Sequence, residues 1–447
     1  MGATRAHGKN RTFPSSGFQL SQASCLAPYP QQTRFMTQPE LLQPTLSTSS
    51  ALSKFFPEGY YPPHTPQMDR LMAELRVIAA NPVVEAAYND AIAHLDPFVM
   101  ELGTQQENPW TGTSIDDFVN YFDKWFTFLP QPSSGLGFIV PLTFLYLNNP
   151  QGFYFLNKLQ SKSGDATAYS AEVFNWTVRF IKERGHFMDS PESIYYLDEW
   201  LKFVGPSIKD YIVPPGGYQT FNEFFARSLN LANNPRPIAD PDDDSILVAS
   251  ADTEINFIES NLTLKTTLPV KTREINVAEL LNNSTYAKRF VGGTAVSCVL
   301  MPTNYHRYHA PVTGQLVEGM DVPGIYNGIM DGEHWFNEGN IGESDTNFSI
   351  FEDFHRAYFI IQTEKYGCVA IIPVGLNTIS AIHPSVVGNA STYVQPGGTP
   401  IPVKKGQELG HFAYGGSLNI LLFEPGVLGS LSVLMGQRIG SLSAPAK

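Results

Sequence analysis

The chain has 447 residues, of which 43% are hydrophobic and 16% are charged, and its formal net charge is −13 at pH 7. This length allows roughly two or three domains with a sizeable core. The acidic balance argues against binding to nucleic acid or to anionic lipid, because both depend on clustered Lys and Arg. No apolar run approaches the roughly 20 residues that a membrane-spanning helix needs, so no integral membrane segment is expected.

Residues 1–60 are predicted to be a disordered tail. They are rich in Ser, Gln, Pro and Thr and contain no acidic residue before Glu40. A basic segment of this kind is typical of a mitochondrial transit peptide, but its prolines interrupt any amphipathic helix and favour disorder. Cys25, Cys298 and Cys368 are too few and too far apart for a disulfide scaffold. A cytoplasmic location is therefore expected, with a mitochondrial one as the alternative.

Residues 61–210 are predicted to form a helical domain. Apolar residues recur there at spacings of three and four, and several helices begin with a capping residue followed by proline or an acidic residue. The apolar stripes are wide and aromatic, which indicates a core rather than a cofactor site. Helices are expected to start at Thr65-Pro66, at Asn81-Pro82 and at Ser114, and to cover about 170–184, ending at Gly185, and about 190–204.

After residue 240 the periodicity changes from helix to strand. Short β-branched or apolar runs are separated by Gly, Pro and Asn, as in a β-rich domain. The predicted fold class is therefore α+β, with the helical domain followed by a β-rich domain over 211–447. The expected strands are 246–250, 263–268, 295–301, 358–363, 369–374 and 420–423.

Two histidines lie three residues apart in "NYHRYHAPVTG" (304–314), just after a predicted strand. The side chains of His306 and His309 would point to opposite faces of a strand but can converge on a turn. A metal site is the weaker interpretation, because no acidic or cysteine ligand follows at a fitting spacing. An acid–base role for a nearby group and an ordinary surface loop both stay open.

A serine follows two glycines in "HFAYGGSLNILLFEPG" (411–426), directly before an apolar run. The plain interpretation is a β-turn, in which Gly415 and Gly416 supply positive φ and Ser417 starts a strand. The alternative is a nucleophilic serine beside flexible backbone. This stretch alone does not decide between them.

Six blocks follow one another in the second half of the chain: "FNEFFARSL" (221–229), "NPRPIADPDDDSILVASADTE" (234–254), "NYHRYHAPVTG", "DVPGIY" (321–326), "IIPVGLNTISAI" (371–382) and "KKGQELGHFAYGGSLNILLFEPG" (404–426). In this order they resemble the phosphatidylserine decarboxylase family over about 220–440. The helical segment, with "ANPVVEAAYNDAI", is similar to the extra N-terminal domain of fungal members, some of which decarboxylate free amino acids such as tryptophan.

The resemblance implies that the chain cuts its own backbone between Gly416 and Ser417. The products would be a β chain, 1–416, and an α chain, 417–447, whose first residue becomes a covalent pyruvoyl cofactor. Glycine can adopt the unusual backbone that attack on the preceding carbonyl requires. A second serine, Ser430 in "VLGSLSV", lacks the family's flanking pattern.

Three further residues take roles from the resemblance. His309 is implied as the base for Ser417, Asp252 as the residue that orients His309, and His306 as the residue of the substrate step. The family's Pro-Ala-Asp-Gly reads Ser-Ala-Asp-Thr here, which puts the role of Asp252 in doubt and leaves Glu254 as the nearby substitute.

The expected function is decarboxylation of a free L-amino acid, aromatic in character such as tryptophan, with the pyruvoyl ketone as electron sink. The alternatives are a phosphatidylserine decarboxylase that makes phosphatidylethanolamine, and a non-processing relative that only binds. Expected partners are the amino-acid substrate and the chain's own α and β products, with a homodimer left open. Four tyrosines are candidates for a substrate pocket, with ordinary packing as the alternative: Tyr305, Tyr308, Tyr326 and Tyr414.

Overall fold

The computed structural model describes most of the chain beyond the predicted tail, and these residues belong to one unit over Thr48–Lys447. The tail prediction for 1–60 lies almost wholly outside the described residues, and the boundary at residue 210 stays a prediction. The described residues are 56, 58–101, 104–132, 137–159, 161–162, 169–170, 172–264, 276–300, 303–325, 354–376, 382–387, 390–433 and 435.

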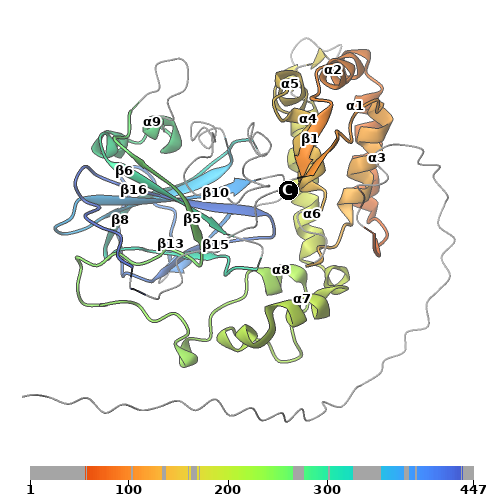
Figure 1. Cartoon of the computed structure of the whole chain (residues 1–447). Helices are drawn as coiled ribbons and strands as arrows, with labels where there is room; N and C mark the ends of the chain where they lie inside the picture. The colour runs from red at the N-terminus through yellow and green to blue at the C-terminus, as the bar shows by residue number, and fades with distance from the viewer. Residues whose placement is uncertain are drawn as a thin grey trace, which may run out of the picture. The chain divides into compact units, whose positions relative to one another are not determined.

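The first part of the described chain is helical, as predicted (Figure 1), and its first three helices begin at the predicted caps Thr65, Asn81 and Ser114. The side chain of Thr65 accepts a hydrogen bond from Met68 N at 3.2 Å, and that of Asn81 accepts one from Val83 N at 3.0 Å. The helices are α1 (Pro66–Ala79), α2 (Pro82–Ala93), α3 (Ile115–Phe126), α4 (Ile139–Tyr146), α5 (Pro150–Asn157), α6 (Glu172–Met188), α7 (Leu197–Val204) and α8 (Phe221–Phe225). Two short strand pairs lie between them: β1 (Phe98–Glu101) with β2 (Thr104–Glu107), and β3 (Ser161–Lys162) with β4 (Tyr169–Ser170).

Two predicted helix boundaries are wrong. Helix α6 continues through Gly185 to Met188, since a single glycine costs an α-helix only about 1 kcal/mol. The Ser-Pro signal at 190 opens a short 3-10 turn, Pro191–Ile194, and α7 begins only at Leu197.

The helices enclose a core of aromatic side chains. Trp125, Trp176 and Phe180 are fully buried and are linked by ring contacts. The buried guanidinium of Arg184 donates to the carbonyl oxygens at the end of α3, which satisfies backbone acceptors that the helix leaves free. Tyr414, from the far end of the sequence, is buried in the same cluster. This insertion connects the helices to the segment that holds the candidate cleavage site.

The second part is built on a seven-stranded antiparallel sheet with strand order β14-β8-β9-β10-β16-β6-β5. A three-stranded sheet, β11-β15-β7, packs beside it, and β12 (Val386–Val387) pairs with β13 (Ala390–Ser391). The strands are β5 (Glu254–Ser260), β6 (Thr294–Leu300), β7 (Arg307–His309), β8 (Gly314–Val322), β9 (Arg356–Gln362), β10 (Cys368–Leu376), β11 (Ile382–Pro384), β14 (Ile401–Val403), β15 (Glu408–Phe412) and β16 (Gly416–Phe423).

Both faces of the large sheet are buried. Along β9, Tyr358 and Ile360 pack toward the short helix α9 (Val277–Leu280), while Phe359 and Ile361 pack toward the three-stranded sheet. Because side chains alternate along a strand, a sheet covered on both faces is apolar at consecutive positions. The continuous apolar runs that the sequence shows are the result, and the α+β class is confirmed.

Four predicted strands are confirmed as β6, β9, β10 and β16, and one is wrong. The segment 246–250 belongs to no strand. Its backbone instead bonds to side-chain and loop partners: Val248 N donates to the Pro311 carbonyl at 3.1 Å, and Lys405 Nζ donates to the Ile246 carbonyl at 3.2 Å. Most of the predicted strand 263–268 lies outside the described residues.

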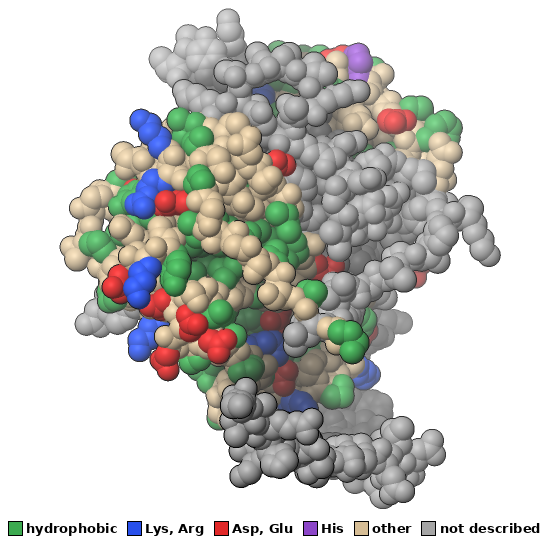
Figure 2. All heavy atoms as spheres, turned by 60° about the vertical axis from the view of Figure 1, so that its left-hand side comes forward, with side chains coloured by type: hydrophobic (Ala, Val, Ile, Leu, Met, Phe, Trp, Pro, Cys, Tyr) green, Lys and Arg blue, Asp and Glu red, His purple; other side chains and the backbone are tan. Residues whose placement is uncertain are grey.

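The described helices include none with the length and apolarity needed to cross a membrane. On the face shown in Figure 2, Lys and Arg side chains lie interspersed with Asp and Glu side chains and form no continuous basic patch among the described residues.

Candidate active site

Ser417 is the second residue of β16, in the middle of the large sheet. It lies opposite Leu300 of β6 and Gly375 of β10. The residue is only 2% exposed, and its Oγ has no hydrogen-bond partner among the described residues. Burying an unbonded hydroxyl costs folding free energy, on the order of 1–3 kcal/mol. The hydroxyls of Ser250 and Ser297 are buried without a partner in the same way, so what distinguishes Ser417 is its place directly after the two glycines.

The chain reaches Ser417 through a bend that connects the two sheets. Strand β15 belongs to the three-stranded sheet and β16 to the large one, so 413–415 carry the chain between them. The amide of Tyr414 donates to Asn222 Oδ1 of α8 at 3.1 Å. Its ring meets the rings of Phe221 and Phe225 edge-on, with centroids 5.2 and 5.3 Å away. Helix α8 therefore fixes the residue three positions before the serine.

His306 is held by the same helix. Its imidazole is fully buried and stacks on the ring of Phe225 with centroids 3.7 Å apart, and neither ring nitrogen has a hydrogen-bond partner among the described residues. Arg227, just after α8, donates to the Thr303 carbonyl at 2.8 Å and so anchors the loop that carries His306. Burial, with the positive charge of Arg227, lowers the pKa of His306 to about 3. His306 is therefore neutral near pH 7 and has no extra proton to donate.

His309 has both ring nitrogens engaged. Nδ1 lies 2.8 Å from the carbonyl oxygen of Gly406, and Nε2 lies 2.9 Å from the hydroxyl of Tyr305. Burial lowers the pKa of this imidazole below its ordinary value.

Asp252 bonds to a different residue from the one that the resemblance implied. Its carboxylate accepts from Arg236, with Nε at 2.9 Å from Oδ1 and Nη2 at 2.8 Å from Oδ2. Among the described residues, Ser417 Oγ has no partner and His309 bonds to Gly406 and Tyr305, so the structure does not bring the three together as a hydrogen-bonded triad. Their roles, that of His306 and that of the substitute Glu254 at the start of β5 stay predictions.

Three of the four tyrosines proposed for a substrate pocket are described, and all three are packed in the protein interior. Tyr305 bonds to His309, and Tyr414 lies in the helical core. Tyr308 is fully buried, with its hydroxyl 3.3 Å from the His383 carbonyl oxygen. Tyr326 lies outside the described residues. A cavity lies beside the bend that precedes Ser417, and none of the three described tyrosines lines it.

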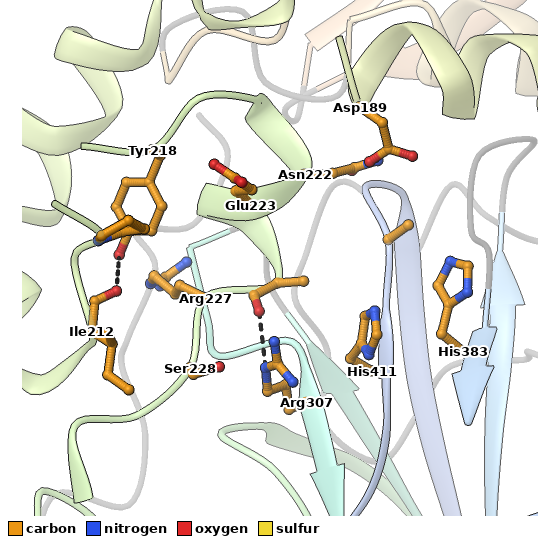
Figure 3. Close-up of a pocket in the computed structure, with 13 residues that line it drawn as sticks. Asp189, Ile212, Tyr218, Asn222, Glu223, Arg227, Ser228, Arg307, His383 and His411 are labelled. Atoms are coloured by element: carbon orange, nitrogen blue, oxygen red, sulfur yellow. Dashed lines mark hydrogen bonds between the residues drawn. The ribbon is translucent and has the colours of Figure 1, made fainter. Parts of the chain in front are cut away.

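That cavity has a volume of about 360 Å³ and adjoins the bend before Ser417 (Figure 3). His383 and His411 lie side by side in it, directly opposite each other on β11 and β15, with ring centroids 4.9 Å apart. Arg307, on the neighbouring strand β7, is paired with His411 and continues the same row, and its side chain donates to the Ala226 carbonyl at 2.9 Å. The residues that line the cavity are Asp189, Ile212, Pro214, Tyr218, Asn222, Glu223, Ala226, Arg227, Ser228, Arg307, His383, His411 and Ala413.

Sequence reasoning did not find this histidine pair. His411 opens the segment that precedes Ser417, but His383 is 28 positions away and lies in none of the quoted blocks, so only the pairing of β11 with β15 brings the two together. Within the described residues, no cluster of three or more His, Cys, Asp or Glu side chains could hold a metal ion.

A sequence model of the phosphatidylserine decarboxylase family matches residues 221–441, which begin at the first residue of α8 and include every candidate catalytic residue. "Phosphatidylserine decarboxylase proenzyme 3" of Schizosaccharomyces pombe is 32% identical over 278 residues, 59% of this chain, but this chain spans only 26% of that relative. The proenzyme of Fusobacterium nucleatum is 30% identical over 54% of this chain and 71% of its own length. That of Brevibacillus brevis is 31% identical over 58% of this chain and 92% of its own length. With bacterial relatives matched at this level over most of their length, the chain belongs to the phosphatidylserine decarboxylase family.

Proposed function

We propose that the chain is a self-processing proenzyme, cut between Gly416 and Ser417, that then acts as a pyruvoyl-dependent carboxy-lyase. The observation that carries this proposal is Ser417 Oγ, a buried and unbonded nucleophile directly after a glycine in a central strand. The relatives' name, proenzyme, supports the same processing.

The cleavage needs only groups of this chain and water. Ser417 Oγ loses its proton to a base and bonds to the carbonyl carbon of Gly416, and the peptide C–N bond breaks to give an ester and a free amine. Removal of the Ser417 α-proton then expels the Gly416 carboxylate, and water replaces the amine nitrogen, which leaves as ammonia. His309 is the proposed base for the first step, because its Nε2 can accept a proton once the Tyr305 hydroxyl moves away.

The site fits the group that this processing leaves. A pyruvoyl ketone at the start of the α chain supplies an electron sink for loss of CO₂ from an α-amino acid. The position is closed to water, and the fully buried His306 lies beside the same helix that holds the bend. Strand β16 is bonded on both sides, to β6 and β10, so the α chain stays bound to the β chain after the cut.

The names of the relatives support phosphatidylserine as the substrate, with its serine headgroup losing CO₂ to give phosphatidylethanolamine. A free L-amino acid, aromatic in character, is the second candidate. Two observations favour it. The cavity of about 360 Å³ lies at the small end of the range of small-molecule pockets, roughly 300–1,000 Å³. The helices between residues 66 and 204 also precede the family match.

The test has two arms. Wild type should run as two chains on a denaturing gel, with an α chain blocked to Edman degradation, while Ser417→Ala should stay a single chain. Ser430→Ala is the matched control, because Ser430 is exposed beyond β16 and should not affect cleavage. CO₂ release is then measured with phosphatidylserine vesicles and with free L-tryptophan, L-tyrosine, L-phenylalanine and L-serine. An intact wild-type chain would refute self-processing, and cleavage before Ser430 would identify a different nucleophile.

A further inference from the structure

The hydrogen bonds of His309 fix which nitrogen carries its proton. The Gly406 carbonyl oxygen can only accept, so the bond at 2.8 Å requires Nδ1 to be the protonated nitrogen. In a neutral imidazole Nε2 is then the acceptor. The Tyr305 hydroxyl, 2.9 Å away, must therefore donate to Nε2.

The backbone around His309 holds this arrangement rigidly. Gly406 has φ = 82°, a left-handed conformation that favours glycine, and a Cβ there would clash with the side chain of Ile238. The Gly406 amide donates to the Ala310 carbonyl at 2.8 Å, and the His309 amide donates to the Ser250 carbonyl at 2.7 Å. The acceptor for Nδ1 is thus part of a fixed turn.

Tyr305 is fixed as well. It is 3% exposed and packs with Tyr211 and Leu229 in a small separate cluster. Its ring lies 27° from parallel to the imidazole of His309, with centroids 5.6 Å apart. Its hydroxyl bonds to His309 Nε2 and to no other side chain or carbonyl among the described residues. Packing, rather than solvent, therefore decides where this hydroxyl points.

The charged groups that face His309 are balanced by partners of their own. Glu408 lies opposite His309 on β15 and pairs with Arg307 at 2.9 Å. Asp252 pairs with Arg236 at 2.8 Å. The uncharged Tyr305 hydroxyl is therefore the group in direct contact with the nitrogen that has to act as the base.

We propose that Tyr305 is a positioning residue for self-cleavage. In the uncut chain its hydroxyl donates a hydrogen bond to Nε2 of His309, and this bond has to break before Nε2 can take the proton of Ser417. This inference rests on the self-processing proposed above. A protonated Nε2 is a donor, so the hydroxyl would have to turn and accept from it, which leaves the buried O–H of Tyr305 without an acceptor among the described residues. The Tyr305 hydrogen bond therefore opposes protonation of Nε2. Without the hydroxyl, the pKa of His309 should be higher. His309 should then stay protonated up to a higher pH, and a protonated His309 cannot act as the base.

The experiment compares Tyr305→Phe with wild type in proenzyme made by cell-free synthesis and followed on gels between pH 5 and 9. The acid-side midpoint of the cleavage rate should rise by on the order of half to one pH unit, the shift that one hydrogen bond supplies. Below that midpoint, cleavage should be roughly 3- to 10-fold slower than in wild type. Tyr308→Phe is the matched control, because its buried hydroxyl contacts the His383 carbonyl, and it should leave the midpoint unchanged.

A second measurement does not depend on cleavage. In Ser417→Ala protein, NMR titration of His309 should give a higher apparent pKa when Tyr305→Phe is added. An unchanged titration, or a rate lowered equally at every pH, would overturn the proposal. A Tyr305→Phe chain that fails to fold even with Ser417→Ala would also reject it, because the hydroxyl would then serve stability. If wild type does not cleave at all, self-processing fails, while the titration still tests the Tyr305–His309 contact.

Discussion

Acid should destabilise the folded chain through the buried imidazole of His306. In the fold, burial beside Arg227 lowers its pKa to about 3, from an ordinary value of 6.5. Between these two values the unfolded chain binds a proton that the folded chain does not. The free energy of unfolding therefore falls as the pH falls below 6.5, and it continues to fall toward pH 3.

The size of the effect follows from the distance below 6.5. At pH 5 the pH lies about 1.5 units below 6.5. At about 1.36 kcal/mol per unit, the free energy of unfolding is lowered by about 2 kcal/mol relative to a protein whose histidine titrates normally. The full gap of about 3.5 units sets an upper limit of about 5 kcal/mol at pH 3. Even the smaller figure is a large share of the roughly 5–15 kcal/mol that holds a typical domain folded.

Urea unfolding of Ser417→Ala protein, which stays a single chain, measures this at pH 7 and pH 5. His306→Gln is added to the same background, because an amide stays neutral at both pH values. The loss of stability from pH 7 to pH 5 should be about 2 kcal/mol smaller with His306→Gln. The glutamine also loses the stack on Phe225, but that loss is present at both pH values and cancels in the difference.

The control is the Ser417→Ala protein without His306→Gln, unfolded at the same two pH values. Other buried histidines with lowered pKa values, His309 and His411 among them, contribute equally in each background. An equal loss of stability with and without His306→Gln would refute the reasoning, because His306 would then titrate in the folded chain as it does in the unfolded one.

Three further substitutions test the site. Asp252→Asn should slow cleavage on a gel time course less than His309→Ala does, because the Asp252 carboxylate bonds to an arginine and acts on His309 only through its charge. If the two variants block cleavage equally, Asp252 must bond directly to His309 during the reaction. Asn222→Ala leaves the buried Tyr414 amide without its acceptor and should lower the free energy of urea unfolding by about 1–3 kcal/mol; an unchanged midpoint would contradict this. His306→Ala should cleave normally but lose about 10²–10⁴-fold in CO₂ release, and an uncut chain would assign it to processing instead.

Local chemistry made much of the fold predictable. The caps at Thr65 and Asn81 act within three residues of themselves, so the starts of α1 and α2 can be placed from the sequence. The apolar runs of β9 and β16 are equally visible, because both faces of their sheet are buried. The run 246–250 has a similar composition but forms no strand, since its backbone partners come from a lysine and a proline far along the chain. The composition of a segment indicates that it is buried, but not which groups its backbone will bond to.

For the candidate site, the sequence indicates residues but not the bonds that they make. The resemblance carried by the ordered motifs indicates Ser417, His306 and His309, whose roles stay predictions. Which group bonds to His309 depends on a turn 97 residues later in the chain, where Gly406 presents its carbonyl. Which group bonds to Asp252 depends on Arg236, 16 residues before it. Side-chain partners of this kind are set by the tertiary fold, and the spacing of a motif does not contain them.

The helices before residue 221 bear on the proposed cleavage site about two hundred residues later, because they pack against the bend that precedes Ser417. The family match begins at α8, yet Tyr414 is buried in a cluster that α8 shares with α1, α3 and α6. Burial raises the pKa of the Tyr414 hydroxyl to about 12, and the charge of Arg184, from α6, opposes that rise. The bend before Ser417 is thus packed on one side by residues that the family does not define. Sequence differences among the helices can therefore alter the bend without any change in the catalytic motifs.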